Sequence, residues 1–156
     1  MSNDAFIRRA DMAKSVKGGG HPGYEFTKKI IVGKEESEHF DVSVYEVPPG
    51  KSAVPYHYHM RNEEVFFILS GKGLLKSPEG EREVFAGDFL FFPNNEKGAH
   101  KITNISQTET LIYADFDIRF DPEIAFYPDS DKVGIFGKDT RLIFPISKQA
   151  TYFDGE

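Results

Sequence analysis

Hydrophobic and polar residues alternate in short runs over most of the chain, and few stretches show the longer period of a helix. Asp41–Val47 alternates clearly, whereas Phe89–Phe92 is continuously apolar up to Pro93. Runs of this kind predict β-strands, and the glycine and proline residues between them predict tight turns. The expected strands cover residues 24–32, 41–47, 64–69, 74–76, 82–85, 89–92, 100–104 and 110–118.

Many short strands at this spacing predict an all-β sandwich or barrel over residues 24–118, without an internal repeat or domain boundary. Residues 1–17 are expected to form a short helix or an extended arm. The glycine-rich sequence 18–23 is expected to be a flexible joint and no regular element. Residues 119–156 contain too many aromatic residues to be disordered. We expect this C-terminal extension to pack on the barrel or on a partner subunit.

Composition narrows the function classes. The chain has 156 residues, which suits one domain with a sizeable core, and 15 Phe with 7 Tyr suit a β-rich interior. The absence of Cys excludes disulfides, thiolate zinc sites and thiol catalysis. A net charge of -6 without a basic patch disfavours nucleic acid. With no signal peptide and no apolar stretch of about 20 residues, a cytoplasmic location away from membranes is expected.

The candidate chemistry lies in His57-Tyr58-His59, Glu64 and His100. Two histidines separated by one residue leave the same face of an extended strand. The polar residues 60–63 can turn the chain, so that Glu64, which opens the next strand, comes beside the two imidazoles. His100 begins a later strand. Three imidazoles and one carboxylate form a good ligand set for one divalent transition metal, such as Fe, Mn, Ni, Co, Zn or Cu.

The environment of Glu64 favours a metal over a merely exposed hairpin. Phe66 and Ile68 share the face of Glu64, so the carboxylate starts an apolar face. A carboxylate buried without a partner costs several kcal/mol or stays neutral through a raised pKa. A divalent cation would remove that penalty and order four side chains at once. The alternative is a metal-free or vestigial site.

Residues next to the candidate ligands have less certain roles. Asn104 shares the strand parity of His100, so it either points inward beside the ligand or caps backbone groups at the strand end. Asp88 is expected to accept backbone N–H bonds in a turn. Tyr58 and Lys101 have the opposite parity to the ligands and should face away from the metal.

The remaining polar candidates lie in loops. Arg61 and Lys97 flank the expected mouth of the site, where they either attract an anionic substrate or are ordinary solvated charges. His21 and His39 are expected to be surface residues.

Two groups of residues resemble the conserved motifs of the cupin superfamily. The first group is Gly50, His57, His59, Glu64 and Gly71, and the second is Gly87, Asp88, Pro93, His100 and Asn104. The chain departs from the common pattern by one extra residue before His57 and two extra residues before His100. Asn95 stands where a glycine is usual, and Gly98 is expected to supply the missing flexibility. The sequence Tyr127–Lys132 also resembles an element of single-domain bacterial cupins, most of which have no assigned activity.

This resemblance implies a double-stranded β-helix of the jelly-roll kind. It also implies a metal bound by His57, His59, Glu64 and His100, with Fe or Mn favoured because related sites use them. Because cupins are often dimers, a homodimer is expected, with the N-terminal arm and the apolar tail as the surfaces that a partner could cover.

Three functions remain open at this point. A metal-dependent enzyme that acts on a small molecule is preferred, of the oxidoreductase or dioxygenase type, and the Phe-rich strands are compatible with the apolar pocket that such an enzyme needs. A sugar-phosphate isomerase would need cationic side chains that bind the phosphate, and only Arg61 and Lys97 are available for this role. A small-ligand-binding protein without turnover is the third reading. The sequence does not identify a general acid or base, because Glu64 is committed to the metal.

Overall fold

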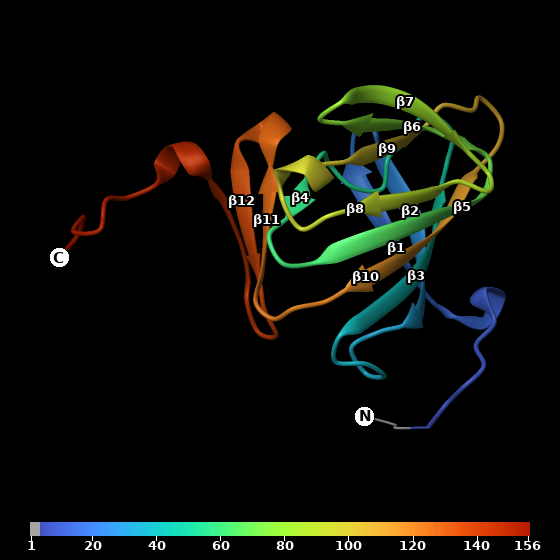
Figure 1. Ribbon diagram of the computed structural model, residues 1–156, viewed down its shortest axis with the longest axis horizontal. Helices are drawn as coiled ribbons and strands as arrows, with labels where there is room; N and C mark the ends of the chain where they lie inside the picture. The colour runs from blue at the N-terminus through green and yellow to red at the C-terminus, as the bar shows by residue number, and fades with distance from the viewer. Residues whose placement is uncertain (1–3) are drawn as a thin grey trace.

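The computed structural model describes residues 4–156, which consist mostly of β-strands (Figure 1). The elements, in chain order, are η1 (Ala10–Met12), β1 (Lys14–His21), β2 (Tyr24–Val32), β3 (Phe40–Val47), β4 (Tyr58–His59), β5 (Glu63–Ser70), β6 (Lys72–Ser77), β7 (Gly80–Phe85), β8 (Phe89–Phe92), η2 (Glu96–Gly98), β9 (Lys101–Asn104), β10 (Leu111–Ile118), β11 (Glu123–Tyr127), η3 (Pro128–Ser130), β12 (Lys132–Phe136), β13 (Arg141–Pro145) and η4 (Ile146–Lys148).

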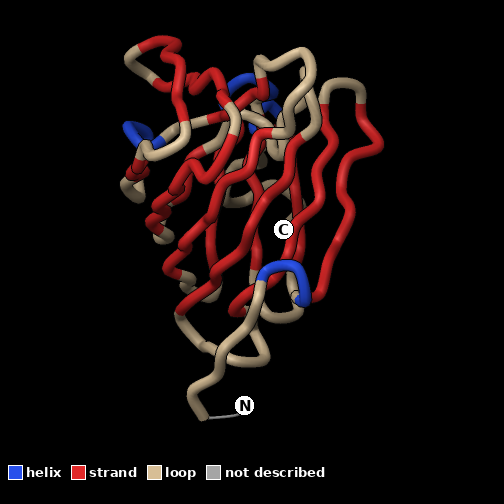
Figure 2. The backbone as a smooth tube through the Cα atoms, turned by 90° about the vertical axis from the view of Figure 1, so that its right-hand side faces the viewer, coloured by secondary structure: helices blue, strands red, loops and turns tan. Residues whose placement is uncertain are grey.

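These strands form three antiparallel sheets, and the first two of them enclose the hydrophobic core. The largest sheet has the order β1-β2-β3-β10-β5-β8, the second the order β7-β6-β9, and the third the order β13-β12-β11-β4. The long strands of the barrel run side by side in Figure 2, with loops gathered at their ends. The architecture confirms the predicted all-β double-stranded β-helix. None of the helices within residues 4–156 is long and apolar enough to cross a membrane.

An aromatic ladder fills the barrel on the inner side of the large sheet. Tyr45 on β3, Tyr113 on β10 and Phe66 on β5 stack in sequence, with ring centroids 5.2 Å and 4.9 Å apart. Ile68 and Leu111 are fully buried beside them. Large rings of this kind supply most of the apolar area that a β core buries.

The inner side of β10 is the one that carries its polar residues. Tyr113 and Asp115 are buried, and they lie opposite Tyr45 and Ser43 of β3. Phe116 and Ile118, on the apolar side of the strand, are exposed. Pairing register fixes which side of a strand faces the core, because a slip of one residue exchanges the two sides. The alternation predicted the strand, but the register decided its orientation.

The glycine-rich sequence is no flexible joint, which corrects that prediction. Gly18 and Gly19 lie within β1, which pairs with β2 as an antiparallel hairpin closed by the turn at Pro22 and Gly23. A Cβ atom at Gly18 would lie 2.1 Å from the ring of Phe26. Gly19 has a φ of +129°, which other residues rarely adopt. The glycines are therefore needed for close packing and bending within a strand.

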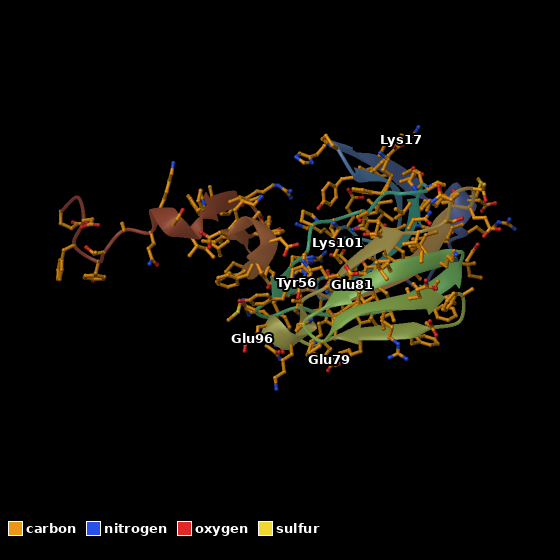
Figure 3. The ribbon with its side chains drawn as sticks, turned by 90° about the horizontal axis from the view of Figure 1, so that it is seen from above. Lys17, Tyr56, Glu79, Glu81, Glu96 and Lys101 are labelled. Carbon is orange, nitrogen blue, oxygen red and sulfur yellow. The ribbon has the colours of Figure 1, made fainter. Side chains whose placement is uncertain are left out.

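The C-terminal extension adds a sheet to one end of the barrel. β11 pairs with β4 so that Ala125 lies opposite His59 and Phe126 lies opposite Tyr58. β12 and β13 continue this sheet outward. After η4 the chain projects away from the barrel (Figures 1 and 3). The extension thus contacts the strand that carries the His-x-His pair.

Asn104 turns inward, and its contacts are those of a cap. Its Nδ2 atom donates to the carbonyl oxygens of Val47 and Glu109, both at 2.8 Å, and its Oδ1 atom accepts from the Ser106 N–H at 2.9 Å. Asn104 is fully buried. Of the two predicted roles, the structure supports the capping of backbone groups.

Replacing Asn104 by alanine is expected to lower the free energy of unfolding by about 3 kcal/mol, because three backbone groups lose their partner and the cost of each lies at about 1–3 kcal/mol. Urea denaturation measures this loss. Asn94→Ala is the matched control, since Asn94 is exposed and should change stability by less than about 0.5 kcal/mol. Equal stability of the two variants would contradict the capping role.

Candidate metal centre

His57 and His100 are held by the same local arrangement on two facing segments. The two residues form an antiparallel bridge, with the N–H of His100 donating to the carbonyl of His57 at 2.9 Å. The Nδ1 atom of His57 lies 2.9 Å from the carbonyl oxygen of Pro55. The Nδ1 atom of His100 lies 2.9 Å from that of Gly98. Because a carbonyl oxygen only accepts, each ring carries its proton on Nδ1 and presents a lone pair on Nε2.

Close packing positions the His100 ring. It stacks on Phe92 with ring centroids 3.7 Å apart and meets the Phe66 ring edge-on at 5.3 Å. The preceding loop is tight, since a Cβ atom at Gly98 would lie 2.0 Å from the carbonyl oxygen of Pro93. Asn95 caps η2, since its Oδ1 atom accepts the N–H of Lys97 at 2.9 Å. Gly98 therefore permits a close approach, where the sequence predicted flexibility.

The structure gathers His57, His59 and Glu64 into one cluster, and His100 reaches the same Glu64 carboxylate. Nε2 of His57 lies 3.1 Å from Nε2 of His59. Oε2 of Glu64 lies 3.4 Å from Nε2 of His59 and 3.4 Å from Nε2 of His100. The Glu64 oxygen and the His100 nitrogen are both buried and have no hydrogen-bond partner among the described residues.

This convergence fits a cation. Burial lowers the pKa of His57 to about 3 and that of His100 well below its usual range, so both rings are neutral and able to coordinate a metal. Burial raises the pKa of Glu64 to about 7. Burial opposes charge on His59 too, but the contact with Glu123 and the charge of Glu64 raise its pKa to about 9. Facing lone pairs and an orphaned buried carboxylate need a positive charge between them, which a proton or a divalent metal supplies.

Glu123, at the start of β11, supports the site from the extension. Its Oε1 atom lies 3.6 Å from Nδ1 of His59 and accepts the N–H of Met60 at 2.9 Å. Its Oε2 atom accepts the N–H of Asn62 at 2.9 Å. A carboxylate behind a ligating imidazole fixes the ring orientation and raises its basicity. Sequence reasoning missed Glu123, since nothing in its local pattern distinguishes it from other carboxylates that begin a strand.

Replacing Glu123 by glutamine is expected to lower metal affinity by about 10–100-fold, because the amide keeps the shape but not the charge behind His59. Competition titration with a chromogenic chelator measures the affinity. Glu83→Gln is the control, because Glu83 is an exposed residue of β7 on another sheet. An unchanged affinity in Glu123→Gln would show that Glu123 supports only the loop.

The sequence analysis did not predict two further carboxylates that lie near the site. Asp117 lies opposite Glu64 in the β10–β5 pairing, and Asp115 lies opposite Phe66 one step deeper. Each has a buried Oδ1 atom without a hydrogen-bond partner in residues 4–156. Burial raises the pKa of Asp117 to about 6 and that of Asp115 well above its usual range. Asp115 and Asp117 are two residues apart on one predicted strand, and this spacing could have indicated from the sequence that both carboxylates lie on the same side of the strand.

The residues predicted to face away from the site do so. Tyr58 stacks on Phe126 with ring centroids 5.1 Å apart, and the Lys101 ammonium lies 5.1 Å from the centroid of the Tyr24 ring (Lys101 is labelled in Figure 3). His21 and His39 are exposed, as expected. Asp88 accepts the N–H of Phe85 at 2.8 Å, which confirms its turn role.

Arg61 does not act as a free cation at the mouth. Its guanidinium donates to the carbonyl oxygen of Pro122 at 2.7 Å and lies 5.0 Å from the Phe120 ring centroid. Lys97 lines a separate hollow with Tyr58 and Phe126, on the outward side of the His-x-His strand. The two residues that the sequence offered as a phosphate clamp are therefore placed elsewhere.

A cavity of about 540 Å³ reaches the site at His59. Asp117, Asn62 and Glu123 line it near the metal centre, and Phe120 and Phe136 contribute apolar wall. Its cations are Lys34, Arg119 and Lys138. Arg119 is bound to the Asp41 carboxylate at 2.7 Å. The exposed side chains of Lys34 and Lys138 have no ion pair within the described chain.

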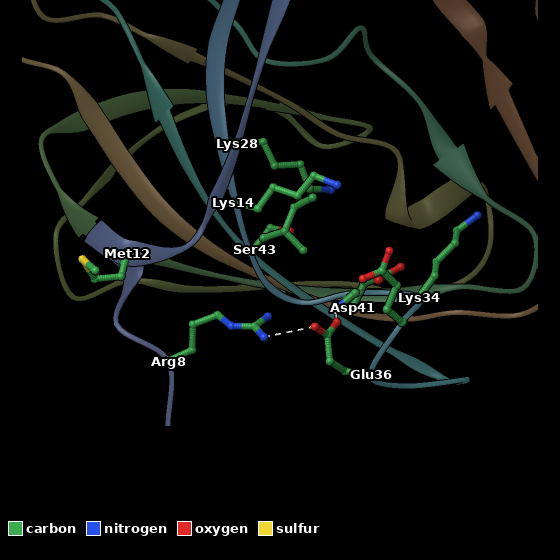
Figure 4. Close-up of a pocket in the computed structure, with 11 residues that line it drawn as sticks. Arg8, Met12, Lys14, Lys28, Lys34, Glu36, Asp41 and Ser43 are labelled. Atoms are coloured by element: carbon green, nitrogen blue, oxygen red, sulfur yellow. Dashed lines mark hydrogen bonds and ion pairs between the residues drawn. The ribbon is translucent and has the colours of Figure 1, made fainter. Parts of the chain in front are cut away.

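A second cavity of about 610 Å³ lies on the inner side of β1, β2 and β3, and Lys34 belongs to both (Figure 4). Lys14, Lys28 and Ser43 line it, together with the ion pair of Arg8 and Glu36 at 3.0 Å. Three lysines from different segments thus line this cavity together with the carboxylates of Glu35, Glu36 and Asp41, and only Lys34 also lines the cavity at His59.

Comparison with known proteins agrees with this geometry. Residues 43–116 match the cupin domain family. An uncharacterized protein of Methanocaldococcus jannaschii is 39% identical over 66 residues, which are 42% of this chain and 50% of that protein. The match therefore spans about half the length of that relative.

Two solved structures resemble almost the whole chain. A provisionally assigned sugar phosphate isomerase of Acidithiobacillus ferrooxidans has a TM-score of 0.82 and 26% identity, over 92% of this chain and 94% of that one. A sugar phosphate isomerase of Silicibacter pomeroyi, from the cupin superfamily, has a TM-score of 0.80 and 20% identity, over 92% and 95% of the two chains. With the matched domain and the enclosed His-x-His and glutamate cluster, these likenesses show that the chain is a member of the cupin superfamily.

Proposed function

We propose that this cupin is a metal-dependent isomerase that acts on a small polyhydroxylated substrate with a phosphate or similar anionic group. His57, His59, Glu64 and His100 would hold the ion, for which Fe or Mn is preferred. A bound divalent ion would act as a Lewis acid on a substrate oxygen. The observation that carries the proposal is the cavity at His59, which combines the unpartnered Asp117 carboxylate with Lys34 and Lys138, beside the carboxylates of Glu38 and Asp121.

Asp117 is the group placed to handle the proton. An aldose–ketose interconversion moves a proton between two neighbouring carbons and needs no external oxidant. The Asp117 carboxylate lines the cavity and lies opposite Glu64 across the strand pair. A carboxylate that can accept and return a proton within reach of a polarised substrate is what such a reaction requires.

Lys34 and Lys138 are placed to bind the anionic end of the substrate. They enter from the β2–β3 loop and the β12–β13 turn, on either side of the cavity. Lys14 and Lys28 line the neighbouring cavity with Lys34, beside the carboxylates of Glu35, Glu36 and Asp41. The provisional isomerase assignment of the Acidithiobacillus protein, which matches over 92% of this chain, supports the same substrate class.

A dioxygenase would need an apolar pocket at the candidate metal centre, with which the Phe-rich strands were compatible. The rings of that pattern belong either to the core, as Phe66 and Phe92 do, or to the outer surface, as Phe89 and Phe91 do. Most residues that line the cavity beside His59 are polar or charged, but most of its exposed surface is apolar, so the cavity is compatible with either reading. The oxygenase reading stays a prediction, and the experiment below includes it.

The test uses the full chain purified without added metal, beside a His59→Ala variant. Metal content is measured first, and it should be near one ion per chain in the wild type and strongly reduced in the variant. Sugar phosphates are then incubated with each protein in D₂O, and NMR records isomer formation and C–H to C–D exchange. Metal-dependent exchange and interconversion are expected for the wild type alone.

Three outcomes would overturn the proposal. Equal metal content in both proteins would remove the site. Oxygen uptake with phenols or diketones, in the absence of isomerisation, would indicate an oxygenase. Saturable sugar-phosphate binding without exchange or turnover would indicate a binding protein.

A further inference from the structure

Asn62 lies on the inner side of the barrel, beside the candidate metal centre. It precedes β5 and shares the parity of Glu64, Phe66 and Ile68, all of which are buried. Asn62 is itself only 6% exposed, and it lines the cavity at His59. Its side chain therefore continues the inner row of β5 by one step beyond Glu64.

Two hydrogen bonds fix the orientation of Asn62. Its Oδ1 atom accepts the N–H of Phe120 at 2.8 Å, and its own backbone N–H donates to Oε2 of Glu123 at 2.9 Å. Because a backbone N–H only donates, the amide atom that faces Phe120 is the oxygen, and the other end of the amide is Nδ2. Both partners belong to the chain that follows β10, which therefore holds the amide in place.

The Nδ2 atom is the free end of this amide. It has no hydrogen-bond partner among residues 4–156, although Oδ1 does. The Oδ1 atom of Asp117 is completely enclosed, whereas Nδ2 of Asn62 keeps accessible surface, which faces the cavity that the side chain lines. A mostly buried donor without an acceptor is costly, and ligand sites use a few such groups to orient the ligand.

The other hydrogen-bonding side chains of this cavity suit different partners. Lys34 and Lys138 suit an anionic group, Asp117 is an acceptor, and His59 belongs to the candidate ligand set. Among the described residues that line the cavity, Asn62 is the only one with an amide side chain. An uncharged donor suits the hydroxyl or carbonyl oxygen of a polyhydroxylated compound, whereas a phosphate is bound best by cations.

We propose that Asn62 donates a hydrogen bond from Nδ2 to a hydroxyl or carbonyl oxygen of the substrate, next to the oxygen that the metal holds. Asn62 thereby selects compounds with two neighbouring oxygens over simple anions. A site built to bond a substrate oxygen discriminates against compounds that lack it, because the donor is then left unpaired. This role rests on the proposed function, since it requires a polyhydroxylated substrate in the cavity.

The alternative is that Asn62 only caps the N–H of Phe120. Asn62→Asp distinguishes the two roles, because it keeps an acceptor for Phe120 and replaces the Nδ2 donor by a second oxygen. Asn62→Ala removes both the acceptor and the donor without adding charge. Asn94→Asp is the matched control, since Asn94 is exposed and its Nδ2 atom lies 3.5 Å from the carbonyl oxygen of Arg61 in the neighbouring loop.

Isothermal titration calorimetry of the full chain loaded with Mn²⁺ tests the proposal. The probes are erythrose 4-phosphate, ribose 5-phosphate and glucose 6-phosphate, with methyl phosphate as an anion without hydroxyl groups. Both Asn62 variants should raise the dissociation constant of the best-bound sugar phosphate about 10-fold, as the loss of one hydrogen bond predicts. Metal content and methyl phosphate binding should stay near the wild-type values. Tm should fall in Asn62→Ala alone, because Phe120 then loses its acceptor.

Wild-type affinity for the sugar phosphate in both variants would restrict Asn62 to the capping role and overturn the proposal. So would a loss confined to Asn62→Asp, which would indicate charge repulsion, an equal loss of methyl phosphate binding, or a loss of metal in both variants. Failure of the wild type to bind any of the sugar phosphates would also overturn it.

The exchange of C–H for C–D, measured on the same proteins, separates this role from the isomerase activity. Sugar-phosphate binding that depends on Asn62, without exchange, would support the role of Asn62 and refute the isomerase. Exchange by the wild type and both variants, with unchanged affinity, would support the isomerase and refute the role of Asn62.

Discussion

Replacing Glu64 by glutamine is expected to lower the affinity for Mn²⁺ by more than about 100-fold, beyond the effect of changing a supporting residue. The amide keeps the size of the side chain but offers neither the charge nor the anionic oxygen that lies 3.4 Å from both His59 and His100. At a metal concentration of about 100 times its dissociation constant, the wild type should gain about 2.7 kcal/mol from binding. For a chain of this size, that gain corresponds to a rise of about 5–10 °C in Tm. The variant should show no such rise.

The same variant separates a metal ligand from a structural core residue. Burial raises the pKa of Glu64 to about 7, so the metal-free fold bears the cost of burying a carboxylate at neutral pH. Removing that cost should leave metal-free Glu64→Gln at least as stable as the metal-free wild type. Differential scanning calorimetry with and without Mn²⁺ measures both quantities. A variant that is much less stable without metal would show that Glu64 serves the fold.

Replacing Asp117 by asparagine is expected to reduce kcat by about 100–10,000-fold, which is the usual contribution of a positioned acid or base. Metal content and Tm should stay near the wild-type values, because Asp117 lines the cavity and is not one of the converging ligands. The measurement is the rate of C–H to C–D exchange with saturating substrate. The prediction rests on the proposed isomerase activity.

Asp139→Asn is the control for this variant, because Asp139 is an exposed residue of the β12–β13 turn. A loss confined to KM in Asp117→Asn would show that Asp117 binds substrate without moving the proton. Loss of metal together with activity would place Asp117 in the ligand set. Full activity would remove it from the mechanism.

Much of the barrel could be predicted from local pattern. β2 and β8 have the predicted bounds, and β3, β5 and β10 differ from the predicted ranges by a residue at one or both ends. Period-two alternation and turn residues are local signals, so they predict a strand and its ends even when the partner strand is unknown. The prediction of a flexible joint at residues 18–23 was wrong because the role of a glycine there depends on a distant contact. Glycine allows both a loop and a close approach, and only the ring of Phe26 across β1 and β2 distinguishes the two.

The sequence by itself determined most of the barrel strands, the all-β class and the candidate ligands, because the strands and His57, His59 and Glu64 follow from local spacing and His100 follows from the resemblance to the second cupin motif. Only the tertiary structure decided that Asp115 and Asp117 face the site and that Phe116 and Ile118 face outward. It alone placed Glu123 behind His59, across 64 residues of sequence. The physical reason is that alternation distinguishes two sides of a strand but not which side is inner. Register between distant strands makes that choice.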